Sequence, residues 1–238
     1  MNKNIEVLSD KAALIERSRE IVLEKLNQTL GSKDKFTIAL SGGSTPKPLY
    51  EALGNESLPW SKIHVFWGDE RYVPADDRDS NQLMARQAFL DKIDIPDRNI
   101  HPINTGAANP RQDAELHERE LHHFFQTLPG EFPVFDLILL GMGDDGHTAS
   151  LFPHTEALAV SDRLVTVGNK DGQPRITFTV PLINHARCVL FVVAGENKRP
   201  ALREVFAQKS DAMHYPARLI QPQGELIWLL DESAAAEL

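Results

Sequence analysis

The chain has 238 residues and a formal charge of −9, and 42% of its residues are hydrophobic and 25% charged. This length predicts one domain or two with a substantial core, and the composition is ordinary for a soluble globular protein. The acidic balance argues against broad nucleic-acid binding, which needs an excess of Lys and Arg on one face, but it is compatible with a locally basic pocket for a small anion.

The chain carries one cysteine and no pattern typical of targeting or of a membrane span. Cys188 lies in the apolar run CVLFVVA and is expected to be a small buried strand residue, because one cysteine cannot form an internal disulfide. The N-terminal stretch MNKNIEVLSDKAAL lacks the apolar core of a signal peptide, and no stretch approaches the ~18 apolar residues of a membrane-spanning helix. We therefore expect a cytoplasmic protein that binds neither nucleic acid nor membrane.

The first half of the chain alternates helical and strand patterns. Helices are indicated by apolar residues at mostly helical spacing and by their ends, with Gly31 as a stop, Pro46 in a first turn and Ser80 or Asn81 as a cap. Strands are indicated by the compact apolar runs FTIAL and IHVFW. The predicted elements are a helix at 9–30, a strand at 36–40, a helix at 46–53, a strand at 63–67, and helices at 80–93 and 110–128.

The second half repeats this alternation over the remaining residues. The predicted elements are a strand at 135–140, a short helical piece at 148–158 interrupted at Pro153, strands at 163–167, 175–180 and 187–193, a helix at 196–208, a strand at 225–230 and a terminal helix at 231–238. Alternation of this kind predicts an α/β fold, with a mostly parallel sheet flanked by helices on both faces, in a single domain that spans residues 1–238.

Four loops at the ends of predicted strands carry the unusual chemistry of the sequence. In open parallel sheets, ligands bind beyond the carboxyl ends of the strands. That rule selects SGGSTP (41–46), GDERYV (68–73), GMGDDGH (141–147) and AGENK (194–198). We therefore expect these loops to meet in one ligand site.

The loop SGGSTP has the composition of an anion site. Gly42 and Gly43 allow a tight turn that exposes backbone amides, Ser44 and Thr45 add hydroxyl donors, and a predicted helix begins directly after them. The spacing is not that of a P-loop. A plain strand-to-helix turn with a Ser or Thr cap is the alternative.

The loop GDERYV places two acidic residues and a cation at a strand end. Asp69, Glu70 and Arg71 would form a working pair of carboxylate and guanidinium in a cleft, or an ordinary solvated ion pair that contributes little. The position at the carboxyl end of a strand favours the first alternative.

The run GMGDDG satisfies the G-x-G-x-x-G spacing of a dinucleotide loop, but its details argue against a nicotinamide site. Asp144 and Asp145 would put two negative charges beside a pyrophosphate. The ribose-binding acid expected about 20 residues later, at the end of the next strand, is also missing, since Asp162 precedes the strand at 163–167.

The same run indicates proton chemistry instead. Asp145 and His147 are two residues apart beside glycines, and a histidine at a strand end is suited to general-base work, although a helix cap or a structural hydrogen bond is the alternative. Zinc is less favoured because no second spaced ligand pair is present. Arg175 and Lys198 would be surface charges singly, but together with SGGST they would clamp a phosphate.

Several long motifs make the chain resemble the 6-phosphogluconolactonases of the small bacterial single-domain type. They run along almost the whole chain, as SGGSTPKPLYEAL, FWGDERYVPADDRDSN, FDLILLGMGDDGHTASLFP, PRITFTVPLINHA and GENKRPAL. The resemblance implies the α/β fold shared with glucosamine-6-phosphate deaminase. It also implies hydrolysis of 6-phospho-D-glucono-1,5-lactone in the pentose phosphate pathway.

Two departures separate the chain from the deaminases of the same superfamily. The deaminase pattern has a catalytic glutamate five residues after its histidine, and Phe152 stands there in this chain. The aspartate after the second strand is followed by Glu-Tyr in the deaminases, whereas Asp69 is followed here by Glu70 and Arg71. A non-catalytic sugar-phosphate sensor is a further alternative, but such regulators usually carry a DNA-binding domain, and the first 35 residues supply only about one helix.

The resemblance implies a role for each candidate residue. His147 takes a proton from water, which attacks the lactone carbonyl, and Asp145 orients His147 or holds substrate hydroxyls. Arg71 stabilises the oxyanion or contacts the substrate, with Asp69 holding it in place. The phosphate is bound by Gly42, Gly43, Ser44, Thr45, Arg175 and Lys198. The expected partner is thus a small phosphorylated sugar lactone, with no metal or organic cofactor, and the sequence is compatible with a monomer or a small homo-oligomer.

Overall fold

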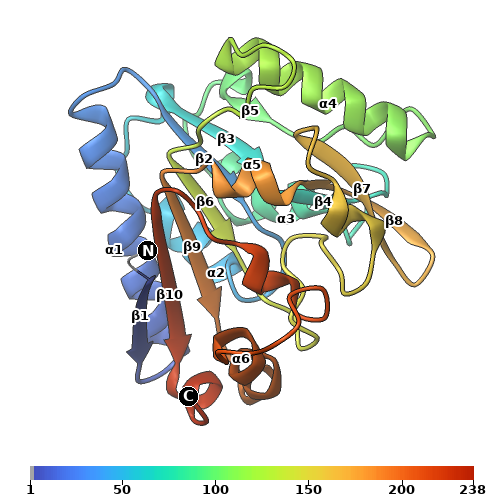
Figure 1. Cartoon of the computed structure of the whole chain (residues 1–238). Coiled ribbons are helices and arrows are strands. Elements are labelled where there is room, and N and C mark those ends of the chain that lie inside the picture. The colour runs from blue at the N-terminus through green and yellow to red at the C-terminus, as the bar shows by residue number, and fades with distance from the viewer. Residues whose placement is uncertain (1–2) are drawn as a thin grey trace.

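The fold is built on a parallel sheet, which the computed structural model shows within residues 3–238, the part of the chain that it describes (Figure 1). The strands of this sheet lie in the order β1-β10-β9-β6-β2-β3-β5, and every neighbouring pair is parallel. Their bounds are β1 Lys3–Leu8, β2 Phe36–Leu40, β3 Ile63–Trp67, β5 Ile100–His101, β6 Leu137–Leu140, β9 Cys188–Val193 and β10 Glu225–Asp231.

A second, antiparallel sheet extends from the end of β3. It has the order β4-β8-β7, with bounds β4 Asp69–Arg71, β7 Val165–Lys170 and β8 Gln173–Phe178. Because β4 follows β3 after a single residue, the hairpin of β7 and β8 is attached beside the carboxyl end of the main sheet (Figure 1). The sequence alternation predicted the parallel sheet but did not predict this separate antiparallel one.

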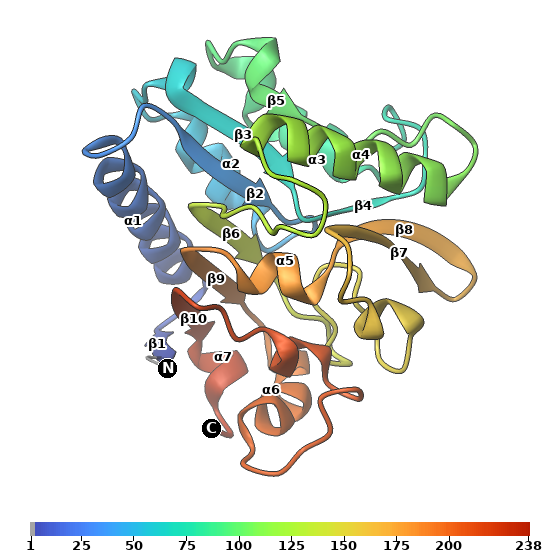
Figure 2. The ribbon, with the colours of Figure 1, turned by 45° about the horizontal axis from the view of Figure 1, so that its top comes forward.

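Helices cover both faces of the parallel sheet. The α-helices are α1 Lys11–Leu30, α2 Lys47–Gly54, α3 Asn81–Ala88, α4 Pro110–Phe125, α5 Val180–Asn184, α6 Arg199–Phe206 and α7 Glu232–Ala235. Helix α1 contacts β1, β2 and β10 and packs against α2, which packs against α3. Helix α5 crosses in front of the sheet in the view of Figure 1, while α2 lies behind it; Figure 2 shows the same arrangement from a tilted direction. The predicted α/β architecture is confirmed.

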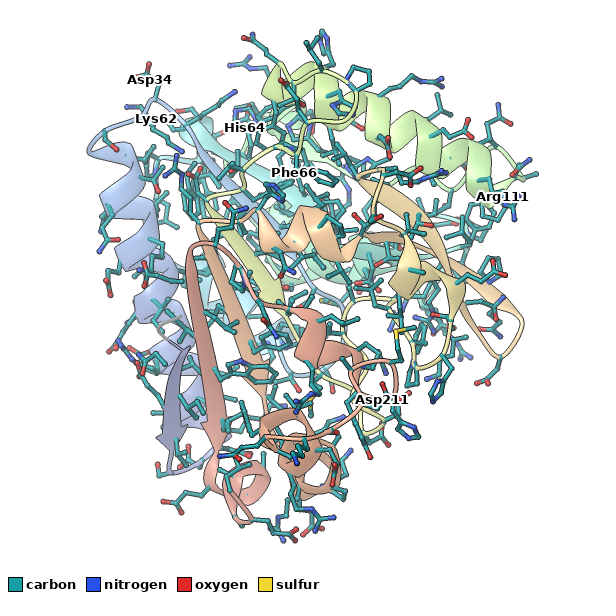
Figure 3. All side chains as sticks on the ribbon, viewed as in Figure 1. Asp34, Lys62, His64, Phe66, Arg111 and Asp211 are labelled. Atoms are coloured by element: carbon teal, nitrogen blue, oxygen red, sulfur yellow. The ribbon has the colours of Figure 1, made fainter. Side chains whose placement is uncertain are left out.

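The apolar side chains form one continuous core around the sheet. Phe66 of β3 has its ring centroid 5.1 Å from that of Phe124 and 5.2 Å from that of Phe135, and His64 lies 4.8 Å from Phe124. Figure 3 shows Phe66 and His64 beneath α4. Cys188 is buried on β9 with a free thiol, as predicted. None of the helices within residues 3–238 combines the length and the apolar character that crossing a membrane requires.

The predicted helical piece at 148–158 is wrong. Thr148 pairs with Leu151 in an isolated bridge, and only Glu156–Ala159 forms a short 3-10 helix. Ala149 and His154 have positive φ angles, which an α-helix does not contain. This segment is therefore folded by contacts with distant parts of the chain rather than by its own helix propensity.

Three strands were missed because they are short or irregular in pattern. β4 has three residues and lies inside the loop GDERYV, and β5 has two. β1 occupies an edge of the sheet, and its Ile5 and Val7 are exposed, so it lacks the apolar run of a buried strand. The predicted helix at 80–93 is also shorter, since α3 ends at Ala88 and a 3-10 turn follows at Leu90–Lys92.

Candidate active site

All four predicted loops meet in one cavity at the carboxyl ends of the parallel strands. The cavity has a volume of about 310 Å³ and also receives residues from the β7–β8 hairpin. Its lining comprises Ser41 to Pro46, Asp69, Arg71, Asn81, Gly141 to Asp144, His147, Ala149, Phe152, Lys170, Arg175, Val192 to Ala194 and Lys198. The structure thus brings every predicted site residue to this cavity except Asp145, which lies behind His147.

His147 is held by Asp145 two residues before it. Its Nδ1 lies 2.5 Å from Oδ1 of Asp145, and the same oxygen accepts the backbone N–H of His147 at 3.0 Å. Because an ionised carboxylate can only accept, Nδ1 carries the proton and Nε2 is left as the acceptor. Nε2 has no hydrogen-bond partner among residues 3–238, and the side chain is 22% exposed on the cavity wall.

The Asp145 carboxylate is ionised at neutral pH. Partial burial raises its pKa, but the hydrogen bonds from the His147 side chain and backbone outweigh that effect and bring the pKa to about 2. The pair therefore offers a proton acceptor at Nε2 whose tautomer is fixed by a permanently charged partner.

Gly143 leaves room for this pair. A Cβ atom on Gly143 would lie 2.1 Å from Nδ1 of His147 and 2.7 Å from Oδ1 of Asp145. No side chain fits there, so the imidazole ring rests directly on the backbone of the loop. Gly143 of GMGDDG thus serves a close approach, but to the histidine of the same loop.

The loop SGGSTP forms the opposite wall. Ser41 at its start is braced by the buried Tyr50, whose hydroxyl contacts both the amide and the carbonyl of Ser41. Gly43 has φ +104°, a conformation that favours glycine. The amides of residues 42–45 donate no hydrogen bond to any residue between 3 and 238, and α2 begins directly after them at Lys47. Such a loop can bind an anion.

Asp69 and Arg71 lie on β4, but the expected contact between them is wrong. Asp69 is buried, and its Oδ2 accepts a hydrogen bond of 2.6 Å from the hydroxyl of Ser150. Arg71 donates instead to the backbone carbonyl of Asp79 at 2.7 Å. Within the described residues, 3–238, the two side chains form no ion pair, because each already has another partner.

Glu70, between them, has a structural role. Its carboxylate accepts the backbone amides of Arg71, Asn81 and Gln82 and the hydroxyl of Ser80. Burial raises the pKa of Glu70, and these hydrogen bonds oppose that effect. Glu70 thereby fixes the start of α3 against β4.

The cavity is basic although the protein is acidic. Four cationic side chains line it, Arg71, Lys170, Arg175 and Lys198, against the two carboxylates of Asp69 and Asp144. The Nζ atom of Lys198 lies 4.0 Å from Oδ1 of Asp144, which is a long distance for an ion pair. Burial and the nearby Arg71 lower the pKa of Arg175, whose Nε has no hydrogen-bond partner among residues 3–238. The site can therefore hold an anion of more than one charge.

Comparison with known proteins identifies the family. The family model described as glucosamine-6-phosphate isomerases/6-phosphogluconolactonase matches residues 9–228. The chain belongs to this family. Curated proteins named 6-phosphogluconolactonase from Nostoc sp. and Synechocystis sp. are each 63% identical to it over 238 residues, which is 100% of this chain and 99% of theirs.

Solved structures of the family have the same fold. The 6-phosphogluconolactonase from Trypanosoma cruzi superposes with a TM-score of 0.89 at 32% identity and covers 100% of this chain and 97% of its own. A monomeric glucosamine-6-phosphate deaminase superposes with a TM-score of 0.82 at 19% identity and covers 99% of this chain and 100% of its own. This likeness concerns the fold alone. Lactonases and deaminases of the family thus share one scaffold.

Phe152 occupies the position where the deaminase pattern has its glutamate. The side chain is 5% exposed, and its ring centroid lies 4.4 Å from that of His147. The guanidinium of Arg175 lies 5.6 Å from the ring centroid of Phe152 and the ammonium of Lys170 lies 5.8 Å from it, both cation–π contacts. At position 152 an apolar ring, rather than a second carboxylate, therefore lies beside the histidine.

Sequence reasoning missed three residues of this family member's site. Lys170 lines the cavity from β7, Asn81 lines it from the start of α3, and Ser150 holds Asp69. Of these three residues, only Asn81 was noted in the sequence, as a candidate helix cap and not as a residue of the site. The other two reach the site because the hairpin and the 148–151 turn fold over it.

The loop after β6 is also unlike a dinucleotide loop in its surroundings. It leads into the Thr148–Leu151 turn and not into an α-helix, so no helix N-terminus faces a pyrophosphate there. Between residues 3 and 238, no group of three or more His, Cys, Asp or Glu side chains is arranged to hold a metal ion.

Proposed function

We propose that this chain hydrolyses 6-phospho-D-glucono-1,5-lactone to 6-phospho-D-gluconate, the lactonase step of the pentose phosphate pathway. The observation that carries the proposal is the His147–Asp145 pair on the wall of a basic cavity, opposite a loop of free amides. The names of the curated relatives at 63% identity agree with this chemistry.

The 6-phosphate of the substrate binds to the loop SGGSTP in this proposal. The amide of Gly43 and the hydroxyls of Ser44 and Thr45 donate to its oxygens, and Gly42 lets the loop approach them closely, since all four residues line the cavity. Arg175 and Lys198 neutralise the charge from the other side. The unpartnered Nε of Arg175 supports this role, because a buried N–H of a guanidinium without a protein acceptor is free to donate to an anion.

The reaction uses His147 as a general base. Nε2 takes a proton from a water molecule, and the hydroxide attacks C1 of the lactone. The tetrahedral oxyanion collapses, the bond between C1 and the ring oxygen breaks, and the imidazolium returns its proton to that oxygen. Asp145 orients the ring and stabilises the imidazolium, a role that the 2.5 Å contact to Nδ1 supports.

Arg71 stabilises the oxyanion in this scheme. It lies on β4 beside the cavity and is anchored by the carbonyl of Asp79, so its guanidinium is preorganised. Asp69 borders the same cavity, and its fixed carboxylate is available to a substrate hydroxyl through the oxygen that Ser150 does not contact.

Phe152 supports hydrolysis over deamination. Deamination with ring opening needs a further acid near the reacting carbons, and the side chain at this position is apolar and packed on His147. Hydrolysis of an activated ester needs one base and one oxyanion partner, and the proposal assigns these roles to His147 and Arg71, which both line the cavity.

The proposal is tested with freshly prepared 6-phosphogluconolactone. We expect release of acid well above the spontaneous rate, and no release of ammonia from glucosamine 6-phosphate under the same conditions. Acid release at the spontaneous rate alone would reject the lactonase, and ammonia release would identify a deaminase.

Replacing Gly143 by alanine is expected to lower kcat by about 10- to 100-fold, because the new Cβ displaces the imidazole by about an ångström. The measurement is the steady-state rate together with the melting temperature. Gly68→Ala is the matched control, since its Cβ would meet only the carbonyl of Leu40 at 3.7 Å. An equal decrease in kcat in both variants would contradict the proposed close contact between the imidazole ring of His147 and the backbone of Gly143.

A further inference from the structure

Asn81 connects two walls of the cavity. It is the first residue of α3 and 1% exposed, and its backbone amide donates to Glu70 at 2.7 Å. Its side-chain Nδ2 donates to the backbone carbonyl of Asp69 at 2.9 Å. Since only the nitrogen of the side-chain amide can donate to a carbonyl, the position of the side-chain oxygen is fixed as well.

That oxygen faces the loop SGGSTP. A Cβ atom on Gly42 would lie 1.9 Å from Oδ1 of Asn81, so the amide group packs directly on the glycine backbone. Oδ1 is buried, and no residue between 3 and 238 donates a hydrogen bond to it. A buried acceptor without a donor is costly, and in a native protein it calls for a partner.

The donors nearest to this oxygen belong to the loop that we assign to the phosphate. The amides of residues 42–45 have no partner within the described chain, 3–238. Gly43 adopts φ +104°, and no atom lies within 4 Å of the position that a Cβ would take there, so its peptide groups have room to turn. Ordering of this loop by an anion would allow the amide of Gly42, which lies against Asn81, to donate to its Oδ1.

We propose that Asn81 is a positioning residue that couples phosphate binding to the reacting groups. This inference rests on the proposed function. When the phosphate orders the loop, the backbone amide of Gly42 donates to Oδ1 of Asn81, and Nδ2 of Asn81 holds the carbonyl of Asp69 on β4, the strand that also carries Arg71. Binding energy from the distant phosphate is thereby used to hold β4 in its reactive position.

The test separates the phosphate from the lactone. Hydrolysis of glucono-1,5-lactone, which has no phosphate, is measured with and without saturating phosphite dianion. We expect phosphite to accelerate the wild-type reaction, and we expect Asn81→Ala to lose roughly three- to tenfold of this acceleration, the factor for one net hydrogen bond. The ratio of activated to basal rate is the readout, because a merely structural defect lowers both rates together.

Asn99→Ala is the matched control. Asn99 is also 1% exposed, and its Nδ2 donates to the carbonyls of Trp60, Ser61 and Ile63, away from the cavity. That variant should lose stability but keep the wild-type ratio. If Asn81→Ala does not fold, Asn81→Ser serves instead, because its shorter side chain cannot join Gly42 to the carbonyl of Asp69 and should also reduce the ratio at saturating phosphite.

The outcomes distinguish this inference from the function on which it rests. Absence of catalysed hydrolysis of the phosphorylated lactone by the wild type rejects the function, and the coupling with it. A wild-type lactonase without phosphite activation, or an Asn81→Ala variant with the full activation ratio, overturns the coupling alone.

Discussion

Replacing His147 by alanine is expected to lower kcat for 6-phosphogluconolactone by about 10²- to 10⁴-fold, the usual contribution of a general base. The fold should survive, because the side chain lies on the cavity wall and its only hydrogen bond is to Asp145, two residues away, within the described residues. The rate is measured after subtraction of spontaneous hydrolysis, and the melting temperature monitors folding. A kcat within a few-fold of the wild-type value would place the base elsewhere.

The pH dependence gives a second view of this pair. Asp145 has a folded pKa of about 2, below its usual 3.8, so its contribution to stability is present above pH 3.8 and is lost as the pH falls through 2. Asp145 therefore stays ionised through the working range, and any loss of activity between pH 4 and 8 must arise from another group. In Asp145→Asn we expect kcat to fall, because the amide no longer fixes the tautomer of His147, and the rate measured between pH 4 and 8 checks this expectation.

Replacing Arg175 by alanine is expected to raise KM for the phosphorylated lactone by roughly 10- to 100-fold, the loss of a charged hydrogen bond to phosphate. The kcat/KM for glucono-1,5-lactone should change little, so the preference for the phosphorylated substrate should largely disappear. A retained preference would remove Arg175 from the phosphate site. Arg163→Ala is the control, because Arg163 is an exposed arginine that forms an ion pair with the neighbouring Asp162 and does not line the cavity among the described residues.

The same variant should not cost stability. Arg175 lies opposite Arg71 in the register of β4 and β8, and like charges at directly opposed positions destabilise a sheet. Burial and Arg71 lower the pKa of Arg175, although the nearby Asp69, Glu70 and Asp79 oppose this effect. We expect an unchanged or slightly raised melting temperature for Arg175→Ala, and a clear decrease would argue for a structural role.

The sequence predicted the scaffold well where local pattern is sufficient. The strands at 36–40 and 63–67 were predicted at their observed bounds, and the long helix that begins near Ser9 was placed within two residues. Compact apolar runs and terminal glycines determine such elements locally. The gathering of the four loops was predicted too, because the carboxyl ends of neighbouring parallel strands lie on one edge of a sheet.

Local pattern failed at 148–158, where distant contacts decide the conformation. The amide of Ser150 is bound by the hydroxyl of Thr177, and the amide of His154 by the carbonyl of Met213. These contacts accompany the positive φ angles of Ala149 and His154 and prevent a helix. No periodicity within the segment encodes them.

The sequence by itself determined the kind of protein and the residue types of its site. Motifs such as GDERYVP and GMGDDGHTASLFP specify the family, and the two-residue spacing of Asp145 and His147 already places a carboxylate within reach of the imidazole. Such a short-range contact depends on local backbone geometry alone. The sequence therefore placed Asp145 near His147, but it left open whether Asp145 orients His147 or holds substrate hydroxyls.

The tertiary structure alone decided the partners across the cavity. Ser150 holds Asp69 across 81 positions of the chain, β8 brings Arg175 opposite Arg71, and α3 places Asn81 against Gly42. Each contact joins segments distant in sequence, and its geometry depends on how the hairpin and helices pack on the sheet. The residue types of the site can thus be identified from the sequence, whereas the pairing of residues across the cavity is a property of the packed fold.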